Sequence, residues 1–437
     1  MLISRRNVIL GAAAALFSRR GHLITLSPRP ADLETSADGL LDEITPTRDF
    51  FVRCHTYVPK VDLSTWKLKV GGLVEKPLEL TLADLKRLPR ASMVSVLECA
   101  GNGRSFYEPH LPGAQWRFGA VGNALWTGVR LRDLLNQAGV KSAATQLLLD
   151  GADSPLGSMP DFQRTLPVRK ALDPDTLLAW AMNGEPLTAE HGFPLRVIAP
   201  GWAGDSWVKW LERIELLDHD FEGFWMKTAY RHPPHPVPAG ASVDAKDMVP
   251  VEDLKVKSVI ARPGDWVKPG LVTVAGVAWS NAAPVTKLEV STDSGRTWAA
   301  AKLRGRVQKY GFRQWSFDWR ASEGQHTLIA RATNAAGETQ PLEQEWNPAG
   351  YLWNVAQPRP IMVSKTGPAP TAVESIGGQQ PDGYSACLGC HDEHMMQQQH
   401  LTREQWDREI GKMTGWGARL NPSQRDAVHQ YLAAQFK

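Results

Sequence analysis

Two cysteines and a histidine near the end of the 437-residue chain have a spacing that suits haem chemistry. Cys387, Cys390 and His391 form a C-x-x-C-H motif, in which two thiols can bond to the haem vinyl groups while the imidazole binds the iron. A redox pair or half of a zinc site would show the same letters. The other two cysteines of the chain do not form a second such pair. A four-ligand zinc site would therefore be incomplete, and the motif predicts haem c and electron transfer.

The residues after this motif predict the helices that would enclose a haem. Thr402 and Gln405 have the spacing of a capping box that opens one helix. Asn421 as N-cap and Pro422 at the first helical position indicate a second helix. Met413 lies on the apolar face of the first helix and is the candidate sixth ligand of the iron. A place in the apolar core is its alternative role.

A second candidate for metal chemistry is Cys99, which follows an apolar run and precedes a Gly-x-Gly turn and Arg104. A thiolate there could bind a metal, and the amides of such a turn could approach an anionic cofactor. An inert buried cysteine is the commoner role, and a disulfide with Cys54 is a further alternative in an oxidising compartment. Cations and imidazoles recur beside apolar runs at 50–55, 191–196 and 208–211. Converging positive charge would suit a phosphate-bearing cofactor and a small oxyanion.

The first residues are typical of a signal that exports folded proteins. Arg5 and Arg6 precede a short apolar stretch, which predicts a twin-arginine signal over residues 1–25 and a periplasmic location. The formal net charge of +3 gives no sign of nucleic-acid binding. No other apolar run approaches transmembrane length, so we expect no stable membrane anchor.

Changes of composition predict four parts after the signal. Residues 35–250 mix strand-like runs with helix-like stretches such as Leu177–Met182, which indicates an α+β domain. Residues 251–352 alternate apolar and polar positions between turns, as in an all-β immunoglobulin-like sandwich. Residues 353–380 are rich in Pro, Gly, Ser and Gln, which predicts a linker. It would lead to a small all-α cytochrome c domain at 381–437.

Several longer motifs occur in order along residues 40–355. They are F-F-V-R-x-H at 50–55, C-A-G-N-x-R at 99–104, A-V-G-N-A-x-W-T-G-V-x-L-R-D-L-L at 120–135, M-N-G-E-P-L-x-x-x-H-G-F-P-L-R at 182–196, V-K-W-L at 208–211, S-T-D-S-G-R-T-W at 291–298 and W-N-P-A-G-Y-L-W-N at 346–354. Together they resemble the sulfite oxidase family of molybdenum enzymes, in its bacterial sulfite dehydrogenase branch. Two departures are Cys54, where we expect a polar residue such as asparagine, and a C-terminal c-type haem in place of an N-terminal b5-type one.

The resemblance implies one molybdopterin whose dithiolene binds molybdenum, with Cys99 as the thiolate ligand from the protein. It implies a substrate anion site made by Arg53, Arg104 and Tyr230 and lined by Trp116. Contacts with the pterin are implied for His55, Asp153, His191, Arg196 and Lys209. Among these, Asp153 has an unexpected spacing from His191. An arginine of the second domain usually helps to close the pocket in this family, and Arg313 is one candidate.

The implied activity is oxygen-atom transfer that converts sulfite to sulfate. Electrons would pass through the fused haem c to an external cytochrome c, and the second domain would mediate a homodimer. One alternative is a sulfane-sulfur dehydrogenase of the same family, acting on protein-bound or thiosulfate-derived sulfur. From another class, the chain could be a non-catalytic haem c electron carrier on a degenerate molybdenum scaffold. A nitrate reductase is the weaker enzymatic alternative, because that branch usually carries flavin and b5 modules.

Overall fold

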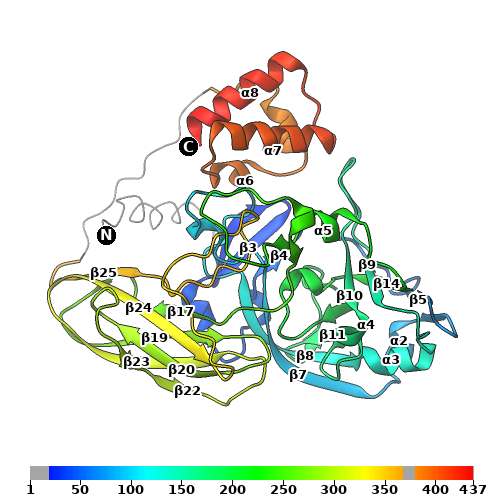
Figure 1. The fold of residues 1–437 in the computed structure, drawn as a ribbon, viewed down its shortest axis with the longest axis horizontal. Coiled ribbons are helices and arrows are strands. Elements are labelled where there is room, and N and C mark those ends of the chain that lie inside the picture. Colours follow the sequence, from blue (N-terminus) through cyan, green and yellow to red (C-terminus); the bar gives the residue numbers. More distant parts are fainter. Residues whose placement is uncertain (1–18, 368–378, 437) are drawn as a thin grey trace.

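The computed structural model describes residues 19–367 and 379–436 and is dominated by β-sheets (Figure 1). Most of the expected twin-arginine signal, residues 1–18, lies outside the described residues. A four-stranded sheet opens the described chain, and its second strand begins inside the range expected for the signal. Its strands are β1 (Arg19–Arg20), β2 (Leu23–Pro28), β3 (Ala31–Thr35) and β4 (Val52–Arg53).

Two five-stranded sheets form the rest of the first domain and share one large apolar core. In order across the first sheet lie β10 (Gln163–Pro167), β9 (Gln146–Gly151), β14 (Leu211–Leu217), β5 (Leu68–Gly72) and β6 (Leu78–Leu80). The second sheet has β12 (Glu185–Pro186), β11 (Leu177–Met182), β8 (Val121–Arg130) and β7 (Arg90–Glu98), with β13 (Arg196–Ile198) also paired to β11. Short helices border them: α2 (Leu82–Leu85), α3 (Leu131–Ala138), α4 (Val168–Ala171) and α5 (Phe224–Lys227).

The prediction of helix at Leu177–Met182 is wrong, because these residues form the strand β11. The strand is hydrogen-bonded to β8 on one side and to β12 and β13 on the other. A short apolar run that is buried among neighbouring strands cannot be distinguished from a buried helix by periodicity alone. The mixed helix and strand content that was expected for the first domain is nevertheless present.

The second domain consists of two sheets packed around an apolar core. One sheet has β17 (Lys257–Arg262), β19 (Gly270–Trp279), β23 (Arg313–Ala321) and β22 (Lys302–Arg304). The other has β18 (Trp266–Val267), β25 (Arg359–Val363), β24 (Gly324–Asn334), β20 (Val285–Ser291) and β21 (Ala299–Ala300). A small hairpin of β15 (Arg231–His232) and β16 (Val249–Pro250) precedes the domain.

The predicted linker began too early. Residues 359–363 form β25, which pairs with β24 and with β18 and so belongs to the second domain. Apolar side chains of this strand, Ile361 and Val363, are buried in the core of that domain. Because most residues around Ile361 and Val363 are polar, the sequence pattern did not indicate this short strand. Residues 368–378 of the expected linker lie outside the described residues.

The C-terminal segment is helical and lies above the first domain in Figure 1. It contains the 3-10 helix η8 (Tyr384–Gly389), α6 (Glu393–Gln397), α7 (Arg403–Gly415) and α8 (Pro422–Gln435). The capping box predicted from Thr402 and the N-cap predicted at Asn421 are both present, and they fix where α7 and α8 begin. Asn421 also forms a capping box with Gln424. The fully buried members of its own small core are Tyr384, Met396, Leu401, Trp406, Ile410, Val428, Leu432 and Phe436.

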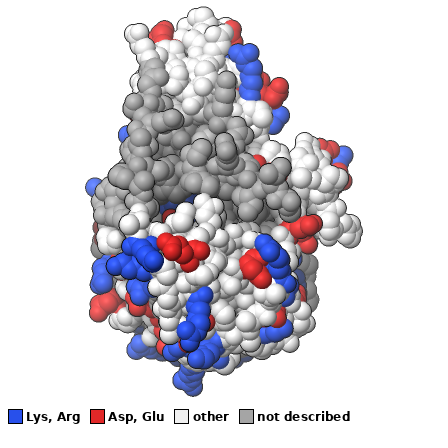
Figure 2. Space-filling model, turned by 90° about the vertical axis from the view of Figure 1, so that its left-hand side faces the viewer, with Lys and Arg blue, Asp and Glu red and all other residues white. Residues whose placement is uncertain are grey.

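The surface of the molecule carries charges of both signs. On the face in Figure 2, Lys and Arg side chains are interspersed with Asp and Glu and do not gather into one patch. This distribution agrees with the nearly balanced composition of the chain. Among the described helices, none has both the length and the apolar character needed to cross a bilayer.

Candidate molybdenum and haem sites

Cys99 lies immediately after β7, where the chain leaves the second sheet. Its backbone N–H donates to the carbonyl of Ala120 at 2.9 Å, and its own carbonyl accepts from Asn102 N–H at 2.9 Å. The thiol is free and partly exposed. Burial raises the pKa of this thiol to about 11, although the neighbouring Arg53 and Arg104 lower it. A metal would therefore have to displace the thiol proton in order to bind the thiolate.

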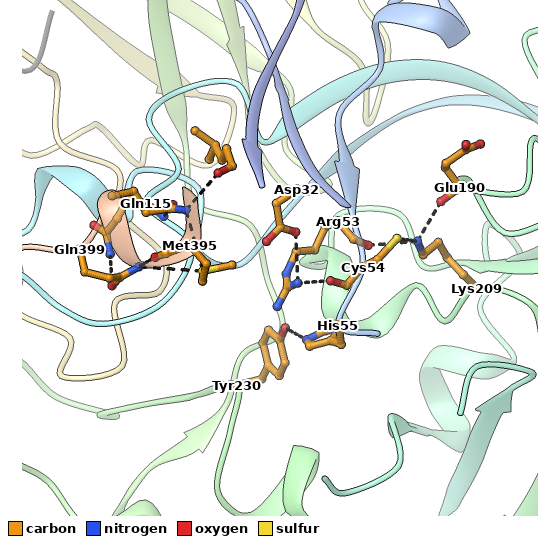
Figure 3. Close-up of polar contacts among 12 residues, drawn as sticks. Asp32, Arg53, Cys54, His55, Gln115, Glu190, Lys209, Tyr230, Met395 and Gln399 are labelled. Atoms are coloured by element: carbon orange, nitrogen blue, oxygen red, sulfur yellow. Dashed lines mark hydrogen bonds and ion pairs between the residues drawn. The ribbon is translucent and has the colours of Figure 1, made fainter. Parts of the chain in front are cut away.

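Arg53 reaches this site from β4 and is fixed by two acceptors. Its Nη1 donates to Asp32 Oδ1 at 3.1 Å and to the carbonyl of Cys54 (Figure 3). Burial opposes the positive charge, but Asp32, Tyr230 and the two cysteines together outweigh it and raise the pKa of Arg53 above its ordinary value. The guanidinium is thus a permanent positive charge near Cys99.

Tyr230 and His55 form a buried hydrogen-bonded pair. Tyr230 Oη and His55 Nε2 lie 2.6 Å apart (Figure 3), and the imidazole stacks on Phe162 with ring centroids 4.3 Å apart. Burial raises the pKa of Tyr230 well above its ordinary value and lowers that of His55 well below. At neutral pH the phenol therefore keeps its proton and the imidazole is uncharged.

Arg104 is oriented by both domains. Its Nη1 donates to the carbonyl of Pro112 at 2.9 Å and to that of Ala349, in the second-domain segment 346–354, at 2.8 Å. The guanidinium lies 5.0 Å from the ring centroid of Tyr351, and that ring stacks on Tyr230 at 5.1 Å. Tyr351 therefore links two predicted anion-site residues. Tyr351 was not among the predicted site residues, although it lies inside the W-N-P-A-G-Y-L-W-N motif at 346–354.

Trp116 and Arg313 were also predicted to line or close the anion pocket, and the structure places them differently from each other. Trp116 is fully buried, with its ring edge-on to Phe51 at 6.5 Å. Arg313 donates from Nη1 to the carbonyls of Arg304 and Gly305, within its own sheet. No contact with a site residue is seen for Arg313 among the described residues, so the structure gives it no part in the pocket.

Lys209 makes three hydrogen bonds from its ammonium group. Nζ donates to the carbonyl of Arg53 at 3.0 Å, to the carbonyl of Glu190 at 2.8 Å and to Cys54 Sγ at 3.2 Å (Figure 3). Burial lowers the pKa of Lys209. Cys54 is therefore a partner of the lysine, and both Cys54 and Cys99 are free cysteines, which rules out the alternative of a disulfide between them in this structure.

The other predicted pterin contacts lie around Lys209. Arg196 is buried and donates to the carbonyl of His191 at 2.9 Å, and its pKa is lowered by burial to about 9. Burial also lowers the pKa of His191 to about 3. The carboxyl of Asp153 has its pKa raised by burial to about 6, although Lys209 lowers it. The assignment of Asp153 to the pterin stays a prediction.

The donor set fits an anionic cofactor beside Cys99. Arg104 and Arg196 are buried and Lys209 is half-buried, and within residues 19–367 and 379–436 none of the three forms an ion pair with a carboxylate. Arg104 Nε and Arg196 Nε are buried without a hydrogen-bond partner. Buried charge and buried N–H groups normally have partners. A phosphate-bearing pterin and an oxyanion would supply them.

A buried network next to Cys99 was also missed. The carboxylate of Glu98 accepts from Asn102 Nδ2 at 2.9 Å, from Lys257 Nζ at 2.5 Å and from Trp279 Nε1 at 2.6 Å. Lys257 and Trp279 belong to β17 and β19 of the second domain. A carboxylate at the end of an apolar strand is the signal that could have prompted a search for a partner, because a buried charge needs one.

The C-x-x-C-H motif lies on η8 and just after it. Cys387 and Cys390 are free and half-buried, and burial lowers the pKa of His391, which favours the neutral imidazole that binds iron. Met413 is half-buried in the last turn of α7. Cysteine, histidine and methionine are the donor types that a haem c needs, and the assignment of Cys387, Cys390, His391 and Met413 to a haem stays a prediction.

Comparisons with known proteins decide the family. A family model described as the oxidoreductase molybdopterin binding domain matches residues 55–225, and one described as the Mo-co oxidoreductase dimerisation domain matches residues 248–358. Sulfite oxidase of Gallus gallus is 33% identical over 345 residues, which cover 75% of this chain and 75% of that protein. The chain belongs to the sulfite oxidase family.

Two further comparisons are consistent with membership of this family. Mitochondrial sulfite oxidase of Homo sapiens is 36% identical over 348 residues, which cover 75% of this chain and only 63% of the human protein. The crystal structure of the sulfane dehydrogenase SoxCD from Paracoccus pantotrophus is similar with a TM-score of 0.68 and 28% identity, over 84% of this chain and 95% of that one. The chain therefore has a mixed α/β molybdopterin-binding domain and a β-rich dimerisation domain, and it spans about 63% of the length of mitochondrial sulfite oxidase.

Proposed function

We propose that this protein is a periplasmic sulfite dehydrogenase that passes electrons from a molybdenum centre through a fused haem c to an external cytochrome c. The observation that carries the proposal is the convergence of Arg53, Arg104 and Tyr230 around the thiol of Cys99. A small divalent oxyanion fits two guanidinium groups and one phenol. The similarity to sulfite oxidases supports sulfite as that anion.

The residues of the anion site would act mainly by their charge and by the positions in which they are held. Arg53 and Arg104 neutralise the bound anion and stabilise the charge that builds up as sulfate forms. Because Tyr230 keeps its proton, its hydroxyl can donate a hydrogen bond to the anion, and His55 fixes the direction of that hydroxyl. The stack of Tyr351 on Tyr230 restricts the phenol further.

The cofactor would be held by Arg196 on β13 and otherwise by residues of loops. Cys99 would ligate molybdenum, and Lys209, Arg196, His191, His55 and Asp153 would contact the pterin. When bound, the molybdenum-molybdopterin group supplies the oxygen-atom transfer chemistry and accepts the two electrons that sulfite loses. The protein supplies the thiolate, the positive pocket and the exclusion of water by buried side chains such as Trp116.

The C-terminal segment would add a one-electron carrier. Cys387 and Cys390 would attach haem c, and His391 and Met413 would be its axial ligands. Because the haem would be on the same chain as molybdenum, the first electron transfer would be independent of protein concentration. The second domain matches a family model for a dimerisation domain, which supports a homodimer.

The test is to mix the oxidised, cofactor-loaded protein with free sulfite and to follow haem absorption without an external acceptor. Rapid reduction of the haem by sulfite is the expected result. If sulfite leaves the haem oxidised while dithionite reduces it, sulfite is not the substrate.

A second candidate is a sulfane-sulfur dehydrogenase. The similarity to the sulfane dehydrogenase SoxCD favours it. In that case a carrier-bound sulfane group, and not free sulfite, would reduce the haem in the same experiment. A non-catalytic haem carrier is disfavoured by the complete set of cations around Cys99, and haem that neither sulfur compound reduces would revive that reading.

A further inference from the structure

The C-terminal segment contacts the first domain through three glutamines, Gln398, Gln399 and Gln405, which we name the glutamine patch. Gln399 Nε2 donates to the carbonyl of Gly113 at 3.0 Å, and its Oε1 accepts from the N–H of the same residue at 3.3 Å. Gln398 Oε1 accepts from the N–H of Gln115 at 2.8 Å. Figure 3 shows Gln115 and Gln399 facing each other. Gln398 Nε2 also donates to the carbonyl of Leu26 in β2 at 3.2 Å, and the remaining hydrogen bonds of the patch to the first domain go to a single loop.

The third glutamine extends this contact along the loop. Gln405 Nε2 donates to the carbonyl of His110 at 2.8 Å, so the patch spans residues 110–115. A separate contact lies at the end of α7, where the carbonyl of Trp416 accepts from Ser158 N–H at 3.1 Å and its ring meets Phe224 edge-on at 6.0 Å. A third contact is at Arg29, whose carbonyl accepts from Asp392 N–H at 3.1 Å and whose Nη2 donates to the carbonyl of Leu388 at 2.6 Å. The segment therefore rests on two loops of the first domain and on the turn between β2 and β3.

The opposite side of the 110–115 loop holds the candidate anion site. The carbonyl of Pro112 accepts from Arg104 Nη1 at 2.9 Å. At Gly113 an added Cβ would lie 3.3 Å from Arg104 Cζ, so the guanidinium packs directly on this part of the loop. The N–H of Ser105 donates to the carbonyl of Trp116 at 3.1 Å. The loop lies between the glutamine patch and Arg104.

We propose that the C-terminal segment positions Arg104: the glutamine patch fixes the backbone of residues 110–115, and this backbone in turn holds the guanidinium. Two amides donate to the patch and two carbonyls accept from it, within one short loop. Since the patch is uncharged, its hold on the loop is insensitive to salt. The segment then has a structural role in the anion site in addition to carrying electrons. This inference rests on the proposed function only in the naming of Arg104 as an anion ligand.

Hydrogen exchange of the full-length, cofactor-loaded protein tests the proposal. We would compare the wild type with the double variant Gln398→Ala/Gln399→Ala and with Gln405→Ala. The control is Gln397→Ala, because Gln397 is exposed and its side chain contacts only Glu393 of its own helix. Loss of one hydrogen bond corresponds to roughly fivefold faster exchange. We expect at least that acceleration at Gly113 and Gln115 in the double variant, with no change in the control.

The amide of Ser105 reports on the Arg104 side of the loop. The proposal predicts that its exchange also accelerates in the double variant, and to a smaller extent in Gln405→Ala, which acts from a different helix. Unchanged exchange at Gly113 and Gln115 would contradict the claim that the glutamine patch fixes the backbone of residues 110–115. Acceleration there with an unchanged Ser105 would overturn the coupling to Arg104. An unchanged haem spectrum and melting temperature in each variant show that the segment is still folded.

Binding of inorganic sulfate separates this inference from the proposed function. If the coupling holds, the double variant binds sulfate several-fold more weakly than the wild type and the control. If the wild type binds no sulfate, the proposed anion site fails, while the exchange of Ser105 still decides whether the glutamine patch positions the loop.

Discussion

The ammonium of Lys257 lies 2.5 Å from the carboxylate of Glu98, although the two residues are separated by 159 positions and belong to different domains. Both side chains are buried. Glu98 is the residue directly before Cys99, so the second domain fixes the end of the strand that presents the candidate metal ligand. A charge pair in this position couples the stability of the two domains.

Lys257→Met should lower the free energy of unfolding by about 3–5 kcal/mol, because it leaves the carboxylate of Glu98 buried without a countercharge. Denaturant unfolding would measure the loss. Adding Glu98→Gln should restore part of it, because the buried group is then neutral. Lys302→Met is the control. Lys302 pairs with Asp318 at 3.5 Å on the surface, and its loss should cost less than about 1 kcal/mol. Equal costs for both lysines would contradict the role of burial.

Cys99→Ser should abolish sulfite-dependent haem reduction, with a loss of at least about 100-fold, since a metal ligand costs more than the outer-shell partners of a ligand. The haem spectrum should not change, because the C-x-x-C-H motif is on a separate segment. Turnover and molybdenum content would be measured together. A variant that kept full activity would remove Cys99 from the metal site.

Gly103→Ala should be more harmful than Gly184→Ala. Both glycines have left-handed backbones, with φ of 94° and 87°, so each substitution carries a strain of about 1 kcal/mol. A Cβ at Gly103 would lie 2.5 Å from Trp353 Cδ1, while one at Gly184 would meet no heavy atom within 4 Å. Overpacking at Gly103 should add about 1–3 kcal/mol. Melting curves of the two variants would compare their stability. Equal losses of stability would show that the side chain of Trp353 moves to make room for the added methyl group.

Acid should destabilise the protein through His191. Its folded pKa of about 3 lies below its ordinary value, so the unfolded chain binds the proton first. The stabilisation is complete above the unfolded pKa of about 6.5 and falls as the pH decreases towards 3. Between pH 7 and pH 5.5 this one histidine should cost about 1 kcal/mol. The difference in unfolding free energy between those two pH values should be smaller by that amount in His191→Gln. An identical pH dependence in both proteins would show that the imidazole is already protonated in the folded state.

Local signals in the sequence predicted the local parts of the fold. The capping box at Thr402 and the N-cap at Asn421 located α7 and α8, because caps act within one turn of a helix. Two predictions failed where a few residues depend on distant partners. Leu177–Met182 is a strand because it pairs with β8 and β13, and β25 is ordered by its pairing with β24 and β18.

The candidate site was predictable to a similar degree. The predicted anion-site residues Arg53, Arg104 and Tyr230 come together around Cys99, although the role of each stays a prediction. Their supports could not be predicted: the Glu98–Lys257 pair, the approach of Ala349 to Arg104 and the stack of Tyr351 on Tyr230 all cross between domains. Spacing along a chain carries no information about such contacts when more than a hundred residues separate the partners.

The glutamine patch recognises the main chain of residues 110–115 and makes only one weak contact with a side chain there, that of Gln115 at 3.4 Å. Every amino acid except proline presents the same N–H and carbonyl groups. The hydrogen bonds of the patch therefore do not depend on which side chains the loop carries, although the ring of His110 also lies 5.5 Å from that of His400 in the C-terminal segment. We therefore expect little correlated substitution between the loop and the C-terminal segment in related sequences. A method that infers contacts from paired substitutions would not detect this contact.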